Sequence, residues 1–248
     1  MRVRRESLAT RVARQWPAWD AATIDAAIRG GELVVEGRAL TNPRAQVPID
    51  AAVRHDPPAD LAGRRKLAWA LERFGVGAEG ASVLDVGAST GGFTTAWLEA
   101  GAARVYAVDV GHGQLLGSLR QDARVVNLER TNVASLDRSL VPERLDAISV
   151  DVSYLALGQA VAQLARLDVG CGADLLGLVK PMFELRLATI PTDRDTLQRA
   201  RDRAVSAITA AGWQVLAADE CPVRGAKGAV EFVVHARQVA RQPLVGGG

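Results

Sequence analysis

The chain has 248 residues, of which 48% are hydrophobic and 23% are charged, a balance typical of one large globular domain or one domain with a small addition. No run of about eighteen apolar residues is present, and the arginine-rich first 14 residues contain no apolar core, so we expect neither a membrane-spanning helix nor a secretory signal. Two cysteines are too few for a disulfide framework or a four-ligand zinc site, which indicates a cytoplasmic protein.

The charge is unevenly distributed along the chain. Residues 1–66 contain 12 basic and 8 acidic residues, whereas the whole chain has a net charge of only +2. A basic N-terminal end suits a polyanionic partner, and a solvated surface explains it equally well. Of 30 basic residues 27 are arginine, and the three lysines are Lys66, Lys180 and Lys227. Because a buried lysine can lose its proton and arginine effectively cannot, these three positions are candidates for chemistry.

Residues 1–58 are predicted to form a small separate α+β unit. The pattern favours a helix over 6–16, a second helix that begins at an N-cap at Asp20, and a short alternating strand over 32–36. The stiff Asp-Pro-Pro segment at 56–58 is expected to be the linker to the next unit.

Residues 59–248 alternate between short apolar strands and helices. The predicted helices cover residues 61–74, 92–100, 157–167 and 195–211. The predicted strands cover residues 82–87, 104–109, 124–128, 145–150, 174–179, 213–218 and 229–235. This alternation indicates an α/β fold with a doubly wound, Rossmann-like sheet and helices on both faces.

Two of the predicted strands end in residues typical of a nucleoside-cofactor site. The strand at 82–87 runs into the turn Asp85-Val-Gly-Ala-Ser-Thr-Gly-Gly92, and the next strand ends at Asp109. In such sheets ligands bind at the carboxyl ends of the strands, where glycines admit the ligand and an acid about 20 residues later accepts hydrogen bonds from ribose hydroxyls. The turn lacks the G-x-G-x-x-G spacing of NAD-binding proteins, so S-adenosylmethionine is the favoured cofactor.

Four further ionisable residues are expected near the same edge of the sheet. Asp151 and Lys180 each follow a predicted strand, and Glu231 lies in the last one. Burying an ammonium group costs several kcal/mol unless it is paired, so Asp151 and Glu231 are candidate partners of Lys180, and Lys66 on the preceding helix can join them. Such a group is either an active site or a structural network of ion pairs.

Together these segments resemble the TlyA family, which belongs to the FtsJ-like group of RNA ribose 2'-O-methyltransferases. The matching motifs are Asp85–Gly92, Glu129–Asn132, Asp151–Ser153, Lys180–Glu184 and Val230–Phe232. The hallmark of that group is a Lys-Asp-Lys-Glu tetrad, which Lys66, Asp151, Lys180 and Glu231 match in chain order.

The resemblance implies a class I methyltransferase domain over 59–248 and an RNA-binding domain of the ribosomal-protein S-four type over 1–58. It further implies S-adenosylmethionine as the cofactor, ribosomal RNA or a ribosomal subunit as the partner, and no requirement for a metal or a membrane. The expected cofactor site contains Asp85, Gly87, Ala88, Ser89, Thr90, Gly91, Gly92, Phe93, Asp109, Val110, Thr131, Asn132 and Asp151.

The resemblance also assigns roles to the tetrad. Lys180 is expected to withdraw the proton of the ribose hydroxyl, with Lys66 nearby and with Asp151 and Glu231 orienting both lysines. The segment after Glu184 is shorter than is usual in the family, which leaves open a small-molecule or other non-ribosomal substrate. An RNA-binding protein without catalysis is disfavoured by the intact tetrad, and a pore-forming haemolysin by the lack of an amphipathic segment.

Overall fold

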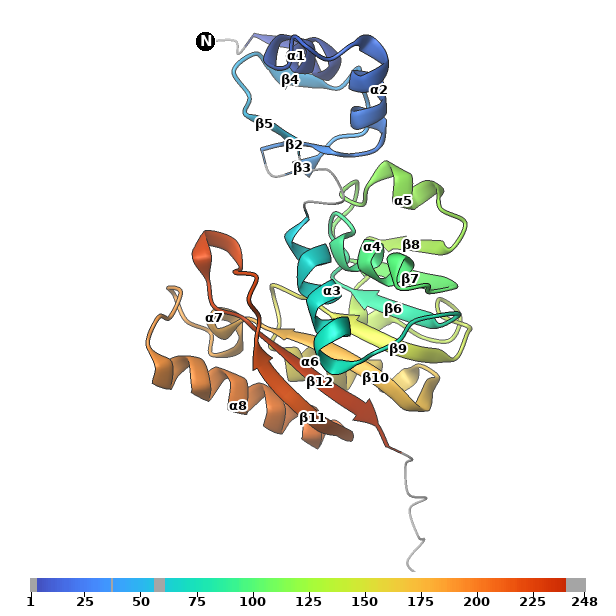
Figure 1. Cartoon of the computed structure of the whole chain (residues 1–248), viewed down its shortest axis with the longest axis vertical. Coiled ribbons are helices and arrows are strands. Elements are labelled where there is room, and N and C mark those ends of the chain that lie inside the picture. Colours follow the sequence, from blue (N-terminus) through green and yellow to red (C-terminus); the bar gives the residue numbers. More distant parts are fainter. Residues whose placement is uncertain (1–3, 37, 56–60, 240–248) are drawn as a thin grey trace, which may run out of the picture.

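The computed structural model of the chain describes residues 4–36, 38–55 and 61–239. The predicted linker at 56–58, and with it the predicted domain boundary, lies outside the described residues. Figure 1 shows a small N-terminal unit next to a larger part built around one sheet. A backbone hydrogen bond from Gly117 to the carbonyl of Gly30 joins the two parts.

The N-terminal unit has two helices and two small sheets around its own core. It contains α1 (Leu8–Gln15), α2 (Ala21–Arg29) and the strands β1 (Arg5–Ser7), β2 (Leu33–Val35), β3 (Arg38–Ala39), β4 (Gln46–Pro48) and β5 (Val53–His55). Asp20 caps α2 as predicted, because its side chain accepts a hydrogen bond from the backbone N–H of Thr23. The first helix begins two residues later than predicted. Ser7 is its N-cap, and residues Arg5–Ser7 form a strand that pairs with β4.

Two tryptophans follow α1 and pack on each other. The rings of Trp16 and Trp19 are stacked with centroids 5.2 Å apart, and His55 meets Trp19 edge-on at 4.8 Å. Both tryptophans also pack against the core of the unit, which includes Leu8 and Ile28. Their rings therefore serve the packing of this unit.

The larger part contains a seven-stranded sheet. Its strands are β6 (Ser82–Val86), β7 (Arg104–Asp109), β8 (Val125–Glu129), β9 (Leu145–Val150), β10 (Val169–Val179), β11 (Trp213–Glu220) and β12 (Phe232–Gln238). Its helices are α3 (Ala62–Phe74), α4 (Gly92–Glu99), α5 (Gly117–Gln121), α6 (Leu157–Ala162), α7 (Pro181–Glu184) and α8 (Arg194–Ala210).

The order of the strands is β11-β12-β10-β9-β6-β7-β8. The five strands from β10 to β8 are parallel to their neighbours, and β12 pairs antiparallel with both β10 and β11. The chain therefore reverses its winding beside β6, where the carboxyl ends of β6, β7 and β9 face a crevice. In open α/β sheets this is the edge at which ligands bind.

Side chains alternate between the two faces of the sheet, and each face is covered by its own helices. Leu84 and Val86 of β6 join a buried cluster that includes Leu157 of α6 and Ile208 of α8. Val83 points to the opposite face, into a cluster built from α3, α4 and the segment around α5. This confirms the predicted sheet with helices on both faces, as Figure 1 also shows.

In the larger part α5 and α7 were not predicted, and three predicted elements have clearly different bounds. β10 begins at Val169 rather than 174, with a register shift before Asp174. β12 begins at Phe232, so Glu231 precedes the strand instead of lying within it. The predicted helix at 157–167 is split into α6 and a 3-10 turn at Gln163–Arg166. None of the helices within the described residues is long and apolar enough to cross a membrane.

Candidate active site

The glycine turn after β6 is held tightly between β7 and β9. The backbone N–H groups of Gly87 and Ala88 both donate to the carbonyl of Val108. Gly87 has a φ of +89°, and a Cβ at this position would overlap the carbonyl oxygen of Asp151. The turn therefore needs glycine for both its conformation and its close packing, which leaves backbone rather than side chains facing the crevice.

Asp109, at the end of β7, links this turn to the next loop. Its carboxylate accepts hydrogen bonds from the backbone N–H of Ser89 at 2.9 Å and of Gly111 at 2.7 Å. Each carboxylate oxygen retains a free lone-pair direction, so the group can still accept from a ligand hydroxyl. Asp109 therefore stands where an acceptor for ribose hydroxyls was predicted.

A narrow pocket of about 20 Å³ lies beside Asp109, with Gly87, Val110 and Thr131 among its lining residues. Tyr154 also lines it and is 47% exposed. Partial burial raises the pKa of the Tyr154 hydroxyl, and the negative charge of Asp109, which lines the same pocket, adds to the effect. Tyr154 was missed in the sequence, although it directly follows the Asp151-Val-Ser153 motif.

Three residues expected in the cofactor site direct their side chains elsewhere. The Asp85 side chain is fully buried and accepts hydrogen bonds from Thr94 and Ser149. Phe93 is buried in the core beneath α4. Asn132 caps a 3-10 turn by accepting from the backbone N–H of Ala134. Asp85 and Phe93 thus support the crevice from below and do not line it.

Burial raises the pKa of the Asp85 carboxyl from 3.8 to about 7, since desolvation outweighs the hydrogen bonds from Thr94 and Ser149. The folded protein then holds a proton on Asp85 that the unfolded chain has released, so stability falls as pH rises from about 4 to 7 and then levels off. Asp85→Asn should remove this slope, worth about 4 kcal/mol over the interval. Urea unfolding of both proteins at several pH values measures it, and parallel stability curves would contradict the assignment.

The tetrad residues form two separate ion pairs. Lys66 Nζ lies 2.5 Å from Glu231 Oε2, and the two side chains are 7% and 6% exposed. Lys180 Nζ lies 2.5 Å from Asp151 Oδ1, and these side chains are 17% and 20% exposed. The first pair is buried, whereas the second is partly exposed.

The fold explains how residues so far apart in sequence meet. Lys66 lies on the buried face of α3, next to Leu67. Lys180 directly follows β10, and Pro181 begins α7 immediately after it. Because β12 runs antiparallel to β10, and Phe232 pairs with Val179, the start of β12 lies at the same edge as the end of β10. Because Glu231 directly precedes β12, it lies at this edge of the sheet, close to the lysines.

Lys180 has a second partner that the sequence analysis did not single out. Its Nζ donates a hydrogen bond to the Ser153 hydroxyl at 2.9 Å. Glu184, which is buried, accepts a hydrogen bond from the backbone N–H of Leu157 and so ties α7 to α6. Burial raises the pKa of the Glu184 carboxyl. These contacts hold the segment after Lys180 against the loop that carries Asp151 and Ser153.

A cavity of about 550 Å³ opens beside the tetrad. Lys66, Lys180 and Glu231 line its charged side, and Lys227 also contributes to the lining. The opposite wall is apolar and comes from α7 and the segment after it, with Pro181, Met182, Phe183, Ile190 and Pro191. Asp151 connects the cavity to the cofactor crevice, because its carbonyl packs on Gly87 while its carboxylate pairs with Lys180.

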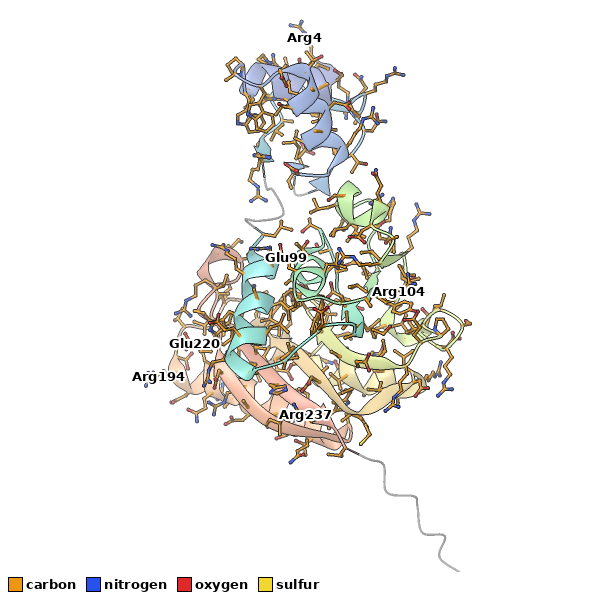
Figure 2. The ribbon with its side chains drawn as sticks, turned by 45° about the vertical axis from the view of Figure 1, so that its right-hand side comes forward. Arg4, Glu99, Arg104, Arg194, Glu220 and Arg237 are labelled. Atoms are coloured by element: carbon orange, nitrogen blue, oxygen red, sulfur yellow. The ribbon has the colours of Figure 1, made fainter. Side chains whose placement is uncertain are left out.

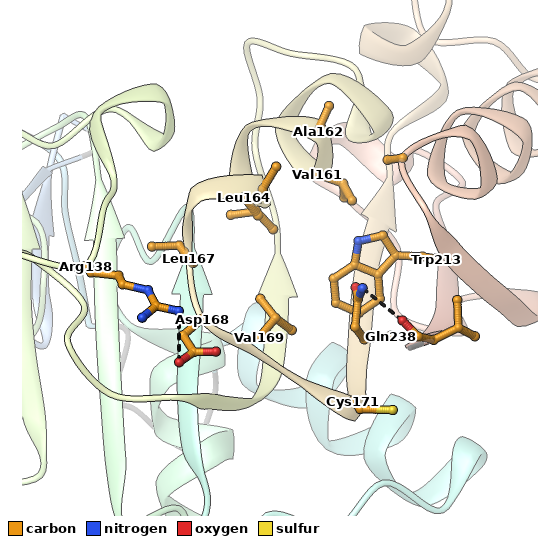
Figure 3. A pocket seen from close by; sticks show the side chains of 13 residues that line it. Arg138, Val161, Ala162, Leu164, Leu167, Asp168, Val169, Cys171, Trp213 and Gln238 are labelled. Atoms are coloured by element: carbon orange, nitrogen blue, oxygen red, sulfur yellow. Dashed lines mark hydrogen bonds and ion pairs between the residues drawn. The ribbon is translucent and has the colours of Figure 1, made fainter. Parts of the chain in front are cut away.

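A second cavity, of about 330 Å³, lies at the other end of the sheet (Figure 3). Its lining includes Val169 and Trp213, which begin β10 and β11, and the ion pair between Arg138 and Asp168. The rest of its lining is mostly aliphatic. It contains none of the predicted site residues, so the candidate active site is the tetrad cavity with the adjoining crevice.

Comparison with known proteins agrees with this architecture. A model of the FtsJ-like methyltransferase family matches residues 63–238. The 16S/23S rRNA (cytidine-2'-O)-methyltransferase TlyA of Mycobacterium tuberculosis is 36% identical over 222 residues, which cover 85% of this chain and 81% of the relative.

Two solved structures share the fold. A Streptococcus thermophilus protein assigned as a hemolysin is 27% identical with a TM-score of 0.70, covering 96% of this chain and 90% of that one. A protein assigned as an S-adenosylmethionine-dependent methyltransferase from Listeria monocytogenes is 13% identical with a TM-score of 0.53, covering 70% and 99%, which shows the fold alone. The chain therefore belongs to the FtsJ-like methyltransferase family and, within it, to the TlyA proteins.

Proposed function

We propose that this protein is an S-adenosylmethionine-dependent methyltransferase that modifies ribose 2'-hydroxyl groups in ribosomal RNA. The observation that carries the proposal is one continuous site. Both tetrad lysines line a single cavity, and Asp151 joins that cavity to the glycine turn and Asp109. The relative from Mycobacterium tuberculosis, which covers most of the chain, has an rRNA 2'-O-methyltransferase activity. Action on ribosomal RNA supports a cytoplasmic location for the protein.

The cofactor residues match the needs of an adenosyl group. Asp109 offers carboxylate oxygens to ribose hydroxyls, and the glycine turn gives the ligand access to backbone groups. Val110, Thr131 and Tyr154 line the pocket beside them. S-adenosylmethionine supplies the methyl group as part of a positively charged sulfonium.

The tetrad residues act on the ribose hydroxyl. Once the Lys180 ammonium has released a proton to solvent, its neutral Nζ would accept the 2'-hydroxyl proton, while bound S-adenosylmethionine would supply the methyl group to the ribose oxygen. Asp151 and Ser153 hold Nζ in place, and the Asp151 carboxylate stabilises the ammonium that results. Lys66 and Glu231, as a buried pair, shape the cavity wall and keep its charge balanced. Alignment of the hydroxyl with the methyl group supplies much of the remaining rate.

The N-terminal unit is proposed to bind RNA. Its core is independent of the sheet, and long side chains project outward from it, Arg4 at its outer end among them (Figure 2). Some of its arginines are occupied within the unit, because Arg5 and Arg11 donate hydrogen bonds to the carbonyls of Gln46 and Ala51. Arg14 and Arg29 form ion pairs with Glu6 and Asp25, whereas exposed arginines such as Arg4 and Arg44 suit the phosphates of a nucleic acid.

Methylation mapping tests the proposed function. Isolated ribosomal subunits incubated with labelled S-adenosylmethionine and the full chain should gain label at one or a few ribose 2'-oxygens. A parallel reaction with a total small-molecule extract tests the alternative substrate, which the 550 Å³ cavity with its apolar wall could admit. Label confined to the extract would overturn the ribosomal assignment while retaining the enzyme class.

Asp109→Ala should weaken S-adenosylmethionine binding about 10- to 100-fold, because a hydrogen bond to a charged group contributes about 1.5–3 kcal/mol. The change also removes the acceptor for the backbone N–H of Ser89 and Gly111. Isothermal titration calorimetry measures the affinity. Asp122→Ala is the matched control, since that carboxylate bonds to nearby Arg124 on the surface. Equal affinity in both variants would show that Asp109 is not a cofactor ligand.

A further inference from the structure

The chain contains three lysines, and the fold brings all three to one cavity. Lys66 and Lys180 belong to the tetrad, and Lys227 lies in a short turn, η4 (Ala226–Gly228), whose side chains share the lining of the same cavity. The other 27 basic residues are arginines, and none of those whose side chains the structure describes lines this cavity. The tetrad accounts for two of the lysines and leaves Lys227 without a role.

The turn holds Lys227 in an uncommon backbone conformation. Its φ is +54° and its ψ is 28°, in the left-handed region that residues other than glycine rarely adopt. Hydrogen bonds from Gly225 N–H to the Ala229 carbonyl and from Gly228 N–H to the Gly225 carbonyl close the turn around it. Such a conformation costs on the order of 1 kcal/mol, so the surrounding contacts must maintain it.

The turn is also seated directly on the tetrad. Gly225 packs so closely on the Glu231 carboxylate that a Cβ at this position would overlap Oε1. Glu231 is in turn paired with Lys66. The position of Lys227 is therefore set by contact with the buried ion pair, although Lys227 itself is exposed at the cavity mouth.

The two tetrad lysines each pair with a carboxylate, and Lys227 differs from them in its ion pairing. Among the residues that the structure describes, no carboxylate lies within ion-pair distance of its ammonium group. An unpaired ammonium at the mouth of a cavity that already holds two ion pairs is available to an anionic group of the substrate. A lysine ammonium binds phosphate as a compact point charge.

We propose that Lys227 binds a phosphate group of the substrate, next to the ribose on which Lys180 acts. This assignment rests on the proposed function and adds the residue that anchors the substrate at the cavity mouth. Lys227 is exposed, whereas Lys66 and Glu231 in the same lining are buried, so a phosphate group that reaches the cavity from solvent meets Lys227 before the buried pair. The phosphate belongs either to an RNA chain or to a small phosphorylated nucleoside.

The test compares variants that separate the effect of the Lys227 charge from the effect of its backbone conformation. Lys227→Asn removes the charge and tolerates a positive φ, and Lys227→Arg keeps the charge. Arg224→Asn is the matched control, because it removes one positive charge from the same loop at a side chain that pairs with Glu220. Steady-state methylation of ribosomal subunits, RNA binding at several salt concentrations and S-adenosylmethionine binding are measured for each protein.

Lys227→Asn should raise the KM for RNA about 10-fold with little change in kcat, and should lower the salt slope of RNA binding by about one. Lys227→Arg should recover most of the loss, Arg224→Asn should behave like the wild type, and cofactor affinity should be the same in all four proteins. Inhibition by a nucleoside monophosphate that depends on Lys227, without any effect on RNA binding, would instead identify a small phosphorylated substrate.

The outcomes distinguish this proposal from the function on which it rests. If the wild type methylates RNA and Lys227→Asn matches Arg224→Asn in every measurement, the lysine assignment is overturned and the function stands. If the wild type methylates no RNA, the proposed function fails. In that case, weaker nucleoside monophosphate binding in Lys227→Asn than in the wild type would support Lys227 as a phosphate ligand. Equal binding in the two proteins would overturn it.

Discussion

Lys180→Arg should fold, bind S-adenosylmethionine and lose methyl transfer by about 10²- to 10⁴-fold, the range typical of a lost general base. Arginine preserves the positive charge beside Asp151 but cannot give up its proton in a protein. If Lys180 served only to neutralise Asp151, the arginine variant would keep much of the activity. Single-turnover kinetics with saturating cofactor measure the chemical step.

Shape is the main confounder, because a guanidinium is larger than an ammonium and can displace the ribose. Lys66→Arg controls for it, since Lys66 lies at the same cavity but is assigned no proton transfer. The loss should be smaller in Lys66→Arg than in Lys180→Arg. Ser153→Ala adds a second check, because it removes one of the two contacts of Nζ and should alter the pH profile without abolishing turnover. Near-wild-type turnover in Lys180→Arg would show that Lys180 is not the base and that the tetrad is a structural network of ion pairs.

The sheet and its functional edge could be predicted because each buried strand has a continuous apolar sequence that ends in a polar residue. In a parallel sheet those ends lie at one edge, so Gly87, Asp109, Asp151 and Lys180 could be assigned to that edge once the strands were recognised. Of the short strands of the N-terminal unit, β2 was predicted, over 32–36, whereas β1, β3, β4 and β5 were missed, because two or three residues, as in β3 and β4, are too few to show alternation.

The details of the site depend on contacts that no local pattern contains. The bond between Lys66 and Glu231 joins residues 165 positions apart, so the division of the tetrad into two pairs follows only from the fold. Asp85 was expected to face the cofactor because it belongs to the glycine motif. Asp85 is part of β6, however, and its side chain is buried on one face of the sheet, where it bonds to Thr94 and Ser149. Ser153 reaches Lys180 because α7 is tied back to α6.

Glu231→Met should destabilise the fold by about 3–5 kcal/mol, because it leaves the buried Lys66 ammonium without its partner. The corresponding change in an exposed pair, Asp25→Asn beside Arg29, should cost no more than about 1 kcal/mol. Denaturant unfolding measures both. Wild-type stability in Glu231→Met would show that Lys66 does not depend on this carboxylate.

The double variant Lys66→Met/Glu231→Met separates the stability of the pair from its part in catalysis. Two apolar side chains of similar length remove both buried charges, and such replacements are often neutral or stabilising. We therefore expect the double variant to regain the stability that Glu231→Met loses. Its methyl transfer should stay low, because the cavity would have lost the charged wall that faces Lys180 and the ribose. Full activity in this stable variant would reduce the tetrad to Asp151 and Lys180, with Lys66 and Glu231 serving the fold alone.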